Sequence, residues 1–315
     1  MRVQTFLVLC AWLVAQTSTA NAVLAEATRV QRDLQRVASE EERSGLDARL
    51  QRSMEAARKG RAYLALHELA APWRSQHAYS FAAQLKGRVT TMDAFRAEWQ
   101  RTGVPRIPPF DGGTLPTVVS ALASSSESAA AATYRASLPY AEDVDVGSGL
   151  YYLGDAYAAA GFGAFCRSLG FPTPGPRLKL RSIAAAMDRF ERDVFKLYDK
   201  ADAAGRRPFI QINVGMKIAR ERDGQGDYAA ALLQYMLARH QLGILVTGPG
   251  GAQADDVSKR LKLFQGAMKN ADHSIGELFV QLATTQLENG DGGGMRSATA
   301  VVDFVLPEYM EIVQR

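Results

Sequence analysis

Histidine, cysteine and serine carry much of protein catalysis and metal binding, and in this chain they are scattered rather than gathered in motifs. The chain has four histidines, His67, His77, His240 and His273. None of them belongs to an H-E-x-x-H motif or stands four residues from another, as zinc ligands on one helix do. The G-x-S-x-G and S-x-x-K motifs of serine nucleophiles do not occur either. The sequence therefore predicts no catalytic residue, no metal site and no cofactor.

The two cysteines, Cys10 and Cys166, are too far apart in the sequence to form a Cys-x-x-Cys motif. Cys166 could act as a nucleophile only beside a histidine that lowers the pKa of its thiol. It follows Phe165 in a stretch of small and apolar residues. We therefore expect Cys166 to be buried and unreactive.

Asp155 is the one charged residue between Gly147 and Cys166. A carboxylate that is buried without a partner has a raised pKa, because desolvation disfavours its charged form, and such groups gather at functional sites. Helical spacing sets Asp155 apart from the apolar stripe of this stretch, so a solvent-exposed position is the alternative. Asp155 is the best single candidate for a site residue, and both positions stay open.

The stretch around Asp155 has the pattern of a closely packed helix. One stripe at helical spacing is large and apolar: Leu150, Leu153, Tyr157 and Ala164. A second stripe carries almost no side chain: Gly154, Ala158 and Gly161. The small stripe lets a neighbouring helix approach closely. A central aspartate would cost ~3 kcal/mol in a bilayer, so the pattern predicts a buried helix and not a membrane span.

Two stretches resemble the tetratricopeptide repeat, a helix–turn–helix unit of roughly 34 residues. The first, about 150–170, has Leu150, Leu153-Gly154, Tyr157 and Gly161 at the spacing of the family's W-x2-L-G-x2-Y pattern and turn glycine. The second, about 212–240, has the turn and second helix of the unit: Gly226, Asp227, Tyr228, Ala231, Tyr235 and Ala238. Gly215 departs from the family pattern, because it stands where a large apolar residue is expected.

The resemblance implies a concave helical groove and the positions that line it. Tyr151 and Asp155 would face this groove in the first match, and Asn213 and Arg220 in the second. Asparagine and arginine suit the role, since they donate hydrogen bonds to peptide carbonyls and carboxylates. The implied ligand-binding residues are therefore Tyr151, Asp155, Asn213 and Arg220.

We expect an all-α fold of helical hairpins, stacked as a tetratricopeptide-like α-solenoid or packed as an irregular bundle. No alternating β-branched runs are joined by hairpin turns. Apolar periodicity predicts helices over 23–58, 62–73, 80–100, 178–204, 208–222, 228–246, 253–288 and 297–314. The first pattern is interrupted at Ser44-Gly45, and it suits an ordinary surface helix better than a coiled coil. An interruption of 253–288 at Asp272 is left open.

The chain begins with the features of a secretory signal. Arg2 is followed by the apolar run 6–14 and by the small-residue site Ala20-Asn21-Ala22. Nine apolar residues are too few to cross a membrane, which needs roughly 20. We therefore expect a signal peptide over 1–22, cleavage near Ala22, and a mature chain without a transmembrane helix that is periplasmic or secreted.

Proline and glycine divide the rest of the chain. The segment 103–116 has four prolines, and proline cannot continue a helix interior, so we expect a linker or a long loop there. On this division, an N-terminal helical segment covers 23–102 and a C-terminal domain of helical hairpins covers 117–315.

The formal net charge of +4 is spread without a basic block, which argues against a nucleic-acid partner. We expect an exported, non-catalytic binding or scaffold protein of the cell envelope that holds a peptide or protein partner. Two alternatives stay open. One is a helical enzyme that acts on envelope glycan, for which two carboxylates suffice. The other is a small-ligand binder whose pocket is lined by aromatic residues near Tyr151 and Phe162.

Overall fold

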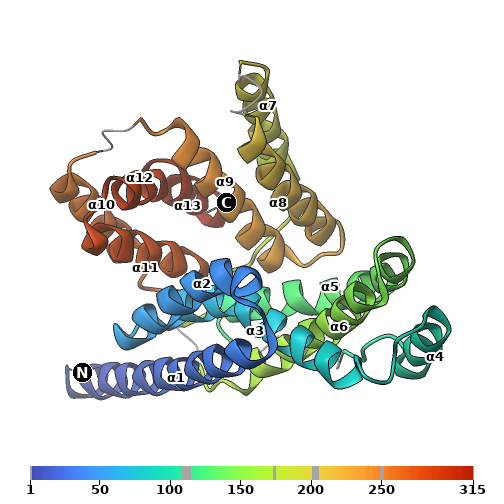
Figure 1. The fold of residues 1–315 in the computed structure, drawn as a ribbon. Coiled ribbons are helices and arrows are strands. Elements are labelled where there is room, and N and C mark those ends of the chain that lie inside the picture. The colour runs from blue at the N-terminus through green and yellow to red at the C-terminus, as the bar shows by residue number, and fades with distance from the viewer. Residues whose placement is uncertain (1, 108–114, 173–174, 201–205, 249–251, 315) are drawn as a thin grey trace. The chain divides into compact units, whose positions relative to one another are not determined.

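The computed structural model describes residues 2–107, 115–172, 175–200, 206–248 and 252–314, with side chains from Thr17 onward. Within these ranges the chain folds into helices joined by turns and short irregular segments, and no strand occurs (Figure 1). The all-α expectation is therefore confirmed. The helices divide between two compact units.

Unit 1 consists of Met1–Leu115 and Leu122–Pro172, and unit 2 of Pro116–Ala121 and Thr173–Arg315. This division differs from the segments expected from the sequence. Residues 122–172, which we expected in a C-terminal domain, pack with the N-terminal helices in unit 1. Part of the proposed linker, residues 108–114, lies outside the described residues.

Unit 1 is built from six helices in its described part: α1 (Arg2–Val37), α2 (Glu40–Arg58), α3 (Ala62–Leu85), α4 (Met92–Thr102), α5 (Thr117–Asp143) and α6 (Val146–Ser168). The first five residues of α5 belong to unit 2. Helix α1 continues through Ala22 without a break, so the predicted cleavage site lies inside a helix.

The break between α1 and α2 corrects our expectation of one at Ser44-Gly45. Ser39 forms a capping box with Glu42: the Glu42 carboxylate accepts from the Ser39 backbone N–H at 2.7 Å, and the Ser39 hydroxyl accepts from the Glu42 N–H. Such reciprocal bonds satisfy two amides that a helix start leaves without partners. Gly45 lies inside α2, where helical glycine is tolerated at a cost of ~1 kcal/mol.

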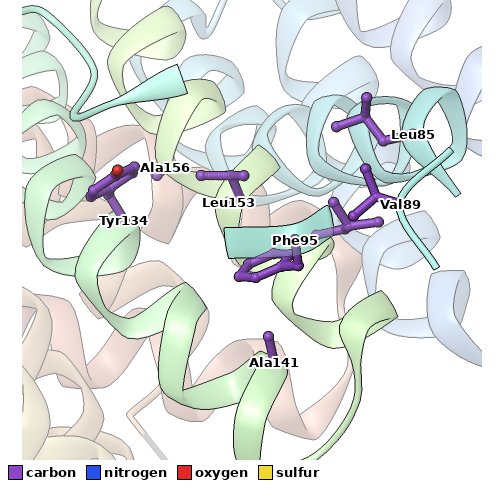
Figure 2. Close-up of a cluster of buried hydrophobic side chains, with 8 residues drawn as sticks. Leu85, Val89, Phe95, Tyr134, Ala141, Leu153 and Ala156 are labelled. Atoms are coloured by element: carbon purple, nitrogen blue, oxygen red, sulfur yellow. The ribbon is translucent and has the colours of Figure 1, made fainter. Parts of the chain in front are cut away.

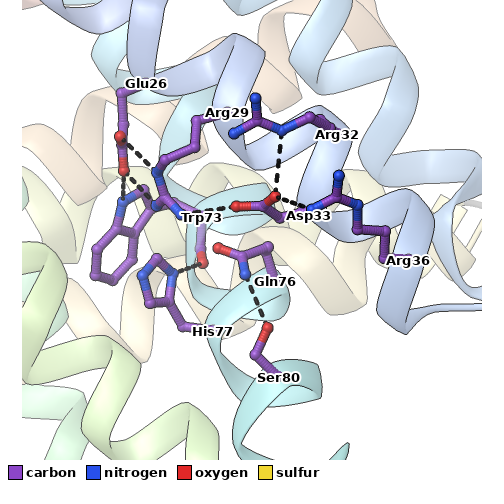
Figure 3. Close-up of polar contacts among 9 residues, drawn as sticks. All are labelled: Glu26, Arg29, Arg32, Asp33, Arg36, Trp73, Gln76, His77 and Ser80. Atoms are coloured by element: carbon purple, nitrogen blue, oxygen red, sulfur yellow. Dashed lines mark hydrogen bonds and ion pairs between the residues drawn. The ribbon is translucent and has the colours of Figure 1, made fainter.

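Helix α3 is longer than the helix expected over 62–73, because it continues through 74–79 to Leu85. It is tied to α1 by the Trp73 indole, which donates to Glu26 at 2.7 Å, and Arg29 holds the same carboxylate (Figure 3). The next break falls at 86–91, and α4 then starts at a Thr91 cap. The expected single helix over 80–100 is therefore wrong: it is divided between the end of α3 and α4.

Helix α6 contacts α3 as closely as its glycines predict. A Cβ added to Gly154 would lie 2.8 Å from the Ala78 carbonyl oxygen and 2.9 Å from the Phe81 Cβ. The large stripe of α6 is buried at Leu150 and Leu153. Leu153 joins Phe95 of α4 and Tyr134 of α5 in an apolar cluster (Figure 2). Gly161, expected as a turn glycine, lies inside α6, so α6 does not end there.

Unit 2 contains α7 (Ala184–Lys200), α8 (Arg207–Gly224), α9 (Tyr228–Val246), α10 (Ala254–Ala267), α11 (Ser274–Asn289), α12 (Gly292–Ala300), the π-helical segment η1 (Val301–Val305) and α13 (Leu306–Gln314). Helix α9 has the bounds expected from the sequence. Gly226, with φ +78°, stands in the turn before it. Residues 178–183 precede α7 and are not helical, contrary to our expectation.

Two local features explain the breaks within the C-terminal part of unit 2. The buried Asp272 carboxylate accepts from the Thr117 N–H and hydroxyl at 2.7 Å and from the Ser274 N–H, which fixes the interruption between α10 and α11. Pro307 follows the π-helical turn η1. Its ring clashes with the carbonyl four residues earlier in a regular helix, and a widened turn relieves this clash.

Among the helices of the described residues, none is both long enough and apolar enough to cross a membrane.

Candidate functional site

The four ligand-binding residues expected from the repeat resemblance divide between the two units. Tyr151 and Asp155 lie on α6 of unit 1, and Asn213 and Arg220 lie on α8 of unit 2. A groove that contains all four side chains therefore stays a prediction.

Asp155 has a partner that the sequence did not reveal. Arg74 of α3 donates through Nε to Oδ1 at 3.0 Å and through Nη2 to Oδ2 at 2.6 Å. The pair is partly buried, with 16 % of the Asp155 side chain and 25 % of the Arg74 side chain exposed. Two parallel charge-assisted bonds fix both groups strongly. Asp155 is therefore a structural link between α6 and α3, and it is not the unpartnered carboxylate considered from the sequence.

Arg220 is also engaged within its own unit. Its guanidinium donates to Glu191 through Nε and to Asp188 through Nη2, both on α7. The hydrogen bonds that it donates to these two carboxylates raise the pKa of Arg220 above its ordinary value. Asn213 is exposed on α8. A ligand that used Arg220 would have to share it with the two acids already bound.

Tyr151 lines a pocket of unit 1 with a volume of about 530 Å³. We call it the tyrosine pocket; it is lined by Val37, Glu42, Tyr79, Lys86, Tyr151 and Tyr152, together with Leu150 and four small residues. Val37 ends α1, Glu42 lies in the first turn of α2, and Tyr79 stands on α3. The pocket therefore depends on three separate helices meeting the start of α6.

The rings of four tyrosines form a continuous chain at this pocket. The ring centroids of Tyr79 and Tyr151 are 4.7 Å apart, and those of Tyr151 and Tyr152 are 5.5 Å apart in an edge-to-face contact. Tyr140 of α5 stacks on Tyr152 at 3.8 Å and is 39 % exposed. Aromatic contacts of this kind contribute about 0.5–1.5 kcal/mol beyond burial and hold the rings in fixed positions.

The phenol groups of the pocket stay protonated well above neutral pH. Burial raises the pKa of Tyr79 to about 12, helped by the neighbouring Tyr151 and Glu42. A hydrogen bond with Tyr140, together with burial, raises the pKa of Tyr152 to about 12. Burial also raises the pKa of Tyr151, whose hydroxyl donates to the Ser75 Oγ at 3.3 Å. Near neutral pH these hydroxyls are therefore uncharged donors and acceptors, and they are not nucleophiles.

The two charged side chains of the pocket, Glu42 and Lys86, differ in how far they are already bonded to other groups of the protein. The Glu42 carboxylate takes part in the α2 capping box, where it accepts from the Ser39 backbone N–H at 2.7 Å. Hydrogen bonds from Ser39, and the charge of Lys86, lower the pKa of Glu42. Lys86 is exposed at the end of α3. The pocket thus offers an approaching ligand a cation at its edge, while its acid is already bonded to the protein.

The surroundings of Cys166 and His77 give these two side chains structural roles. Cys166 is completely buried, and burial raises the pKa of its thiol, which opposes formation of the reactive thiolate. His77 bonds the Trp73 carbonyl through Nδ1. In the part of the chain that the structure describes, no three histidine, cysteine or acidic side chains are grouped so as to hold a metal ion.

Sequence reasoning found Tyr151 but missed Tyr79, Tyr140 and Tyr152. The adjacent Tyr151-Tyr152 was a signal, because neighbouring helix positions point about 100° apart and two rings there cover a wide face. Tyr79 gave no such signal, since it stands in a stretch where no helix was expected.

Comparison of the chain with protein-family models, with curated proteins and with solved structures gave no match.

Proposed function

We propose that this chain is an exported, non-catalytic binding protein of the cell envelope, which holds a peptide segment of a partner protein in the tyrosine pocket. The observation that carries the proposal is the pocket itself: a volume of about 530 Å³ bordered by three tyrosines whose rings contact one another. Ligand pockets typically measure about 300–1,000 Å³ and combine apolar walls with a few placed polar groups.

A peptide fits the chemistry of this pocket. Tyrosine gives a large contact area with only two side-chain torsions to fix, and this is why it is common in protein-binding surfaces. Phenol hydroxyls can donate to peptide carbonyls, since they remain protonated. Lys86 at the edge favours a segment in which an acidic residue neighbours an apolar one. The tetratricopeptide resemblance supports the same class of function and belongs to this proposal.

The test is a selection from a displayed library of random linear peptides on the full chain. Selected peptides should bind the parent protein and lose about tenfold or more in affinity on Tyr151→Ala, since truncation of an aromatic anchor commonly costs more than 1 kcal/mol. Phe195→Ala is the matched control: it removes an aromatic ring that is 64 % exposed on α7 of unit 2. Thermal melts of each variant separate lost binding from lost folding.

The possible outcomes of this experiment distinguish the candidate functions. If the selected peptides bind Tyr151→Ala as tightly as the parent, the tyrosine pocket is not the binding site. An equal loss on Asn213→Ala and Arg220→Ala would favour the shared groove expected from the repeat resemblance. If the parent bound chito-oligosaccharides and selected no peptide, the glycan alternative would replace this proposal.

Export is tested separately, by the mass of the protein recovered from the envelope of a producing bacterium. A chain that begins at Val23 supports the signal peptide. Cleavage there would remove the buried Ala20 and the Thr19 hydroxyl, which donates to the Gly170 carbonyl at 3.2 Å. Recovery of the uncleaved chain from the cytoplasm would overturn the localisation.

A further inference from the structure

A second, smaller cavity lies in unit 2, apart from the tyrosine pocket. Its volume is about 230 Å³, below the range of drug-sized sites. We call it the acyl pocket; it is lined by Lys179, Arg181, Ile183, Tyr228, Leu232 and Ile312, together with Leu180 and three small residues. Its size suits one short alkyl chain or a single ring.

The walls of the acyl pocket are apolar, and its edge is cationic. Ile183 and Leu232 are buried, and Ile312 is half-buried. Lys179 and Arg181 are exposed and belong to the irregular segment that precedes α7. Within the described residues, neither cation makes an ion pair with a carboxylate. The lining contains no acidic side chain.

One acid outside this lining is bonded to two of the lining residues, Ser182 and Ile183. Asp223 of α8 accepts from the Ser182 hydroxyl at 2.5 Å and from the Ile183 N–H at 2.8 Å, and these bonds anchor the segment that carries both cations. The two cations are thus kept at the mouth of an apolar cavity without a carboxylate of the pocket to neutralise them.

From this geometry we infer that the acyl pocket binds a small carboxylic acid with a short apolar chain. The chain would enter between Ile183, Leu232 and Ile312, and the carboxylate would be bound by Lys179 and Arg181. Burial of each methylene of the chain favours binding through the hydrophobic effect, and the charged head adds charge-assisted hydrogen bonds. An uncharged ligand of the same length would lack the second contribution, and an inorganic anion would lack the first.

The experiment titrates the full chain with octanoate and, separately, with octanol and with sulfate. We expect saturable binding of octanoate, with octanol and sulfate each about tenfold weaker or more, since tenfold corresponds to about 1.4 kcal/mol. The exposed double variant Lys179→Gln/Arg181→Gln should bind octanoate about tenfold more weakly than the parent and no better than octanol. The matched control is Lys217→Gln/Arg207→Gln, which removes two exposed cations of α8 outside the pocket and should bind octanoate as the parent does.

Several results would overturn the inference. Octanol that binds as tightly as octanoate would mean that the cations do not select the ligand. Sulfate that binds as tightly would mean a general anion patch. A tripeptide that ends in leucine also combines a carboxylate with an alkyl group, and tighter binding of this peptide would mean that the pocket binds a peptide C-terminus rather than a free acid. An equal loss in the control variant would place the effect in net charge rather than in the pocket.

Discussion

The first repeat-like pattern lies on α6, which packs against α3 in unit 1, and the second lies on α8 and α9 of unit 2. These two helix pairs, α3–α6 and α8–α9, pack differently. Both have a glycine against the neighbouring helix. A Cβ on Gly154 would lie 2.8 Å from a backbone oxygen of α3, whereas a Cβ on Gly215 would meet only the Ala238 Cβ at an ordinary 3.6 Å. The same residue type is thus required by close backbone contact in one pair and dispensable in the other.

The ion pairs of α6 and α8 also differ: the pair on α6 is the more buried of the two. Asp155 and Arg74 join α6 to α3 in a partly buried, bidentate pair. Arg220 joins α8 to α7 at the surface, where its side chain is 37 % exposed and those of Asp188 and Glu191 are 54 % and 42 % exposed. A shared sequence pattern therefore does not fix how tightly helices pack.

The largest effect is expected for Gly154→Leu. The new side chain would be forced into the backbone of α3, and overpacking of this kind typically costs 1–3 kcal/mol. We expect a loss of more than ~2 kcal/mol in unfolding free energy, measured by urea denaturation. Gly45→Leu is the control, because a Cβ at this exposed position of α2 meets nothing within 4 Å. A Gly154→Leu protein that unfolds like its parent would contradict the close contact.

Asp155→Asn comes next. It keeps the shape of the side chain but leaves the Arg74 guanidinium, 25 % exposed, without its carboxylate. A hydrogen bond to a charged group contributes about 1.5–3 kcal/mol, so we expect a loss of about 2 kcal/mol in chemical denaturation. Restoring a carboxylate with Asp155→Glu should recover part of the loss. If Asn is tolerated without cost, the pair does not join α6 to α3 energetically.

Gly215→Ala should stabilise the protein by about 0.5–1 kcal/mol. Alanine is the better helix former by this amount, and its methyl group fits against Ala238 at 3.6 Å. The shift appears as a higher denaturant midpoint at unchanged slope. Gly154→Ala is the matched substitution, and it should move the midpoint in the opposite direction. Two midpoints that move together would remove the distinction between the two helix pairs.

Arg220→Gln should have the smallest effect on stability. Exposed ion pairs contribute about 0.2–1 kcal/mol each, so the expected loss lies near the lower end of that range. Thermal melts at low and at high salt provide the measurement, and the difference from the parent should shrink as salt screens the pair. A loss as large as that of Asp155→Asn would show that the α7–α8 pair depends on this arginine.

Much of the fold followed from local pattern. The 3.6-residue periodicity gave the all-α class and the bounds of α9, because a helix is made from bonds between residues four apart. The run of small residues correctly placed a close contact at Gly154. The ends of the helices were predicted less accurately. The break before α2 falls at Ser39 and not at the expected Ser44-Gly45, and residues 178–183 precede α7 without being helical.

The candidate site was predicted only in part. Asp155 was recognised as the one charge in its stretch, and Tyr151 was named from the repeat resemblance. The ring of Tyr79 and the guanidinium of Arg74 come from α3, and Arg74 is 81 positions away from Asp155 in the sequence. Periodicity within one helix carries no information on which distant helix it will meet. For this reason the partner of Asp155 was missed.

The helical class of the chain and the large and small faces of α6 could be derived from residue order alone, as could the lack of a familiar catalytic motif. Three features became visible only in the folded chain: residues 122–172 pack with the N-terminal helices, four tyrosines meet in one chain of rings, and Lys179 and Arg181 border an apolar cavity. The difference lies in the range of the interactions. Helix formation is a property of neighbouring residues, whereas pockets arise where side chains from separate helices pack and leave space between them.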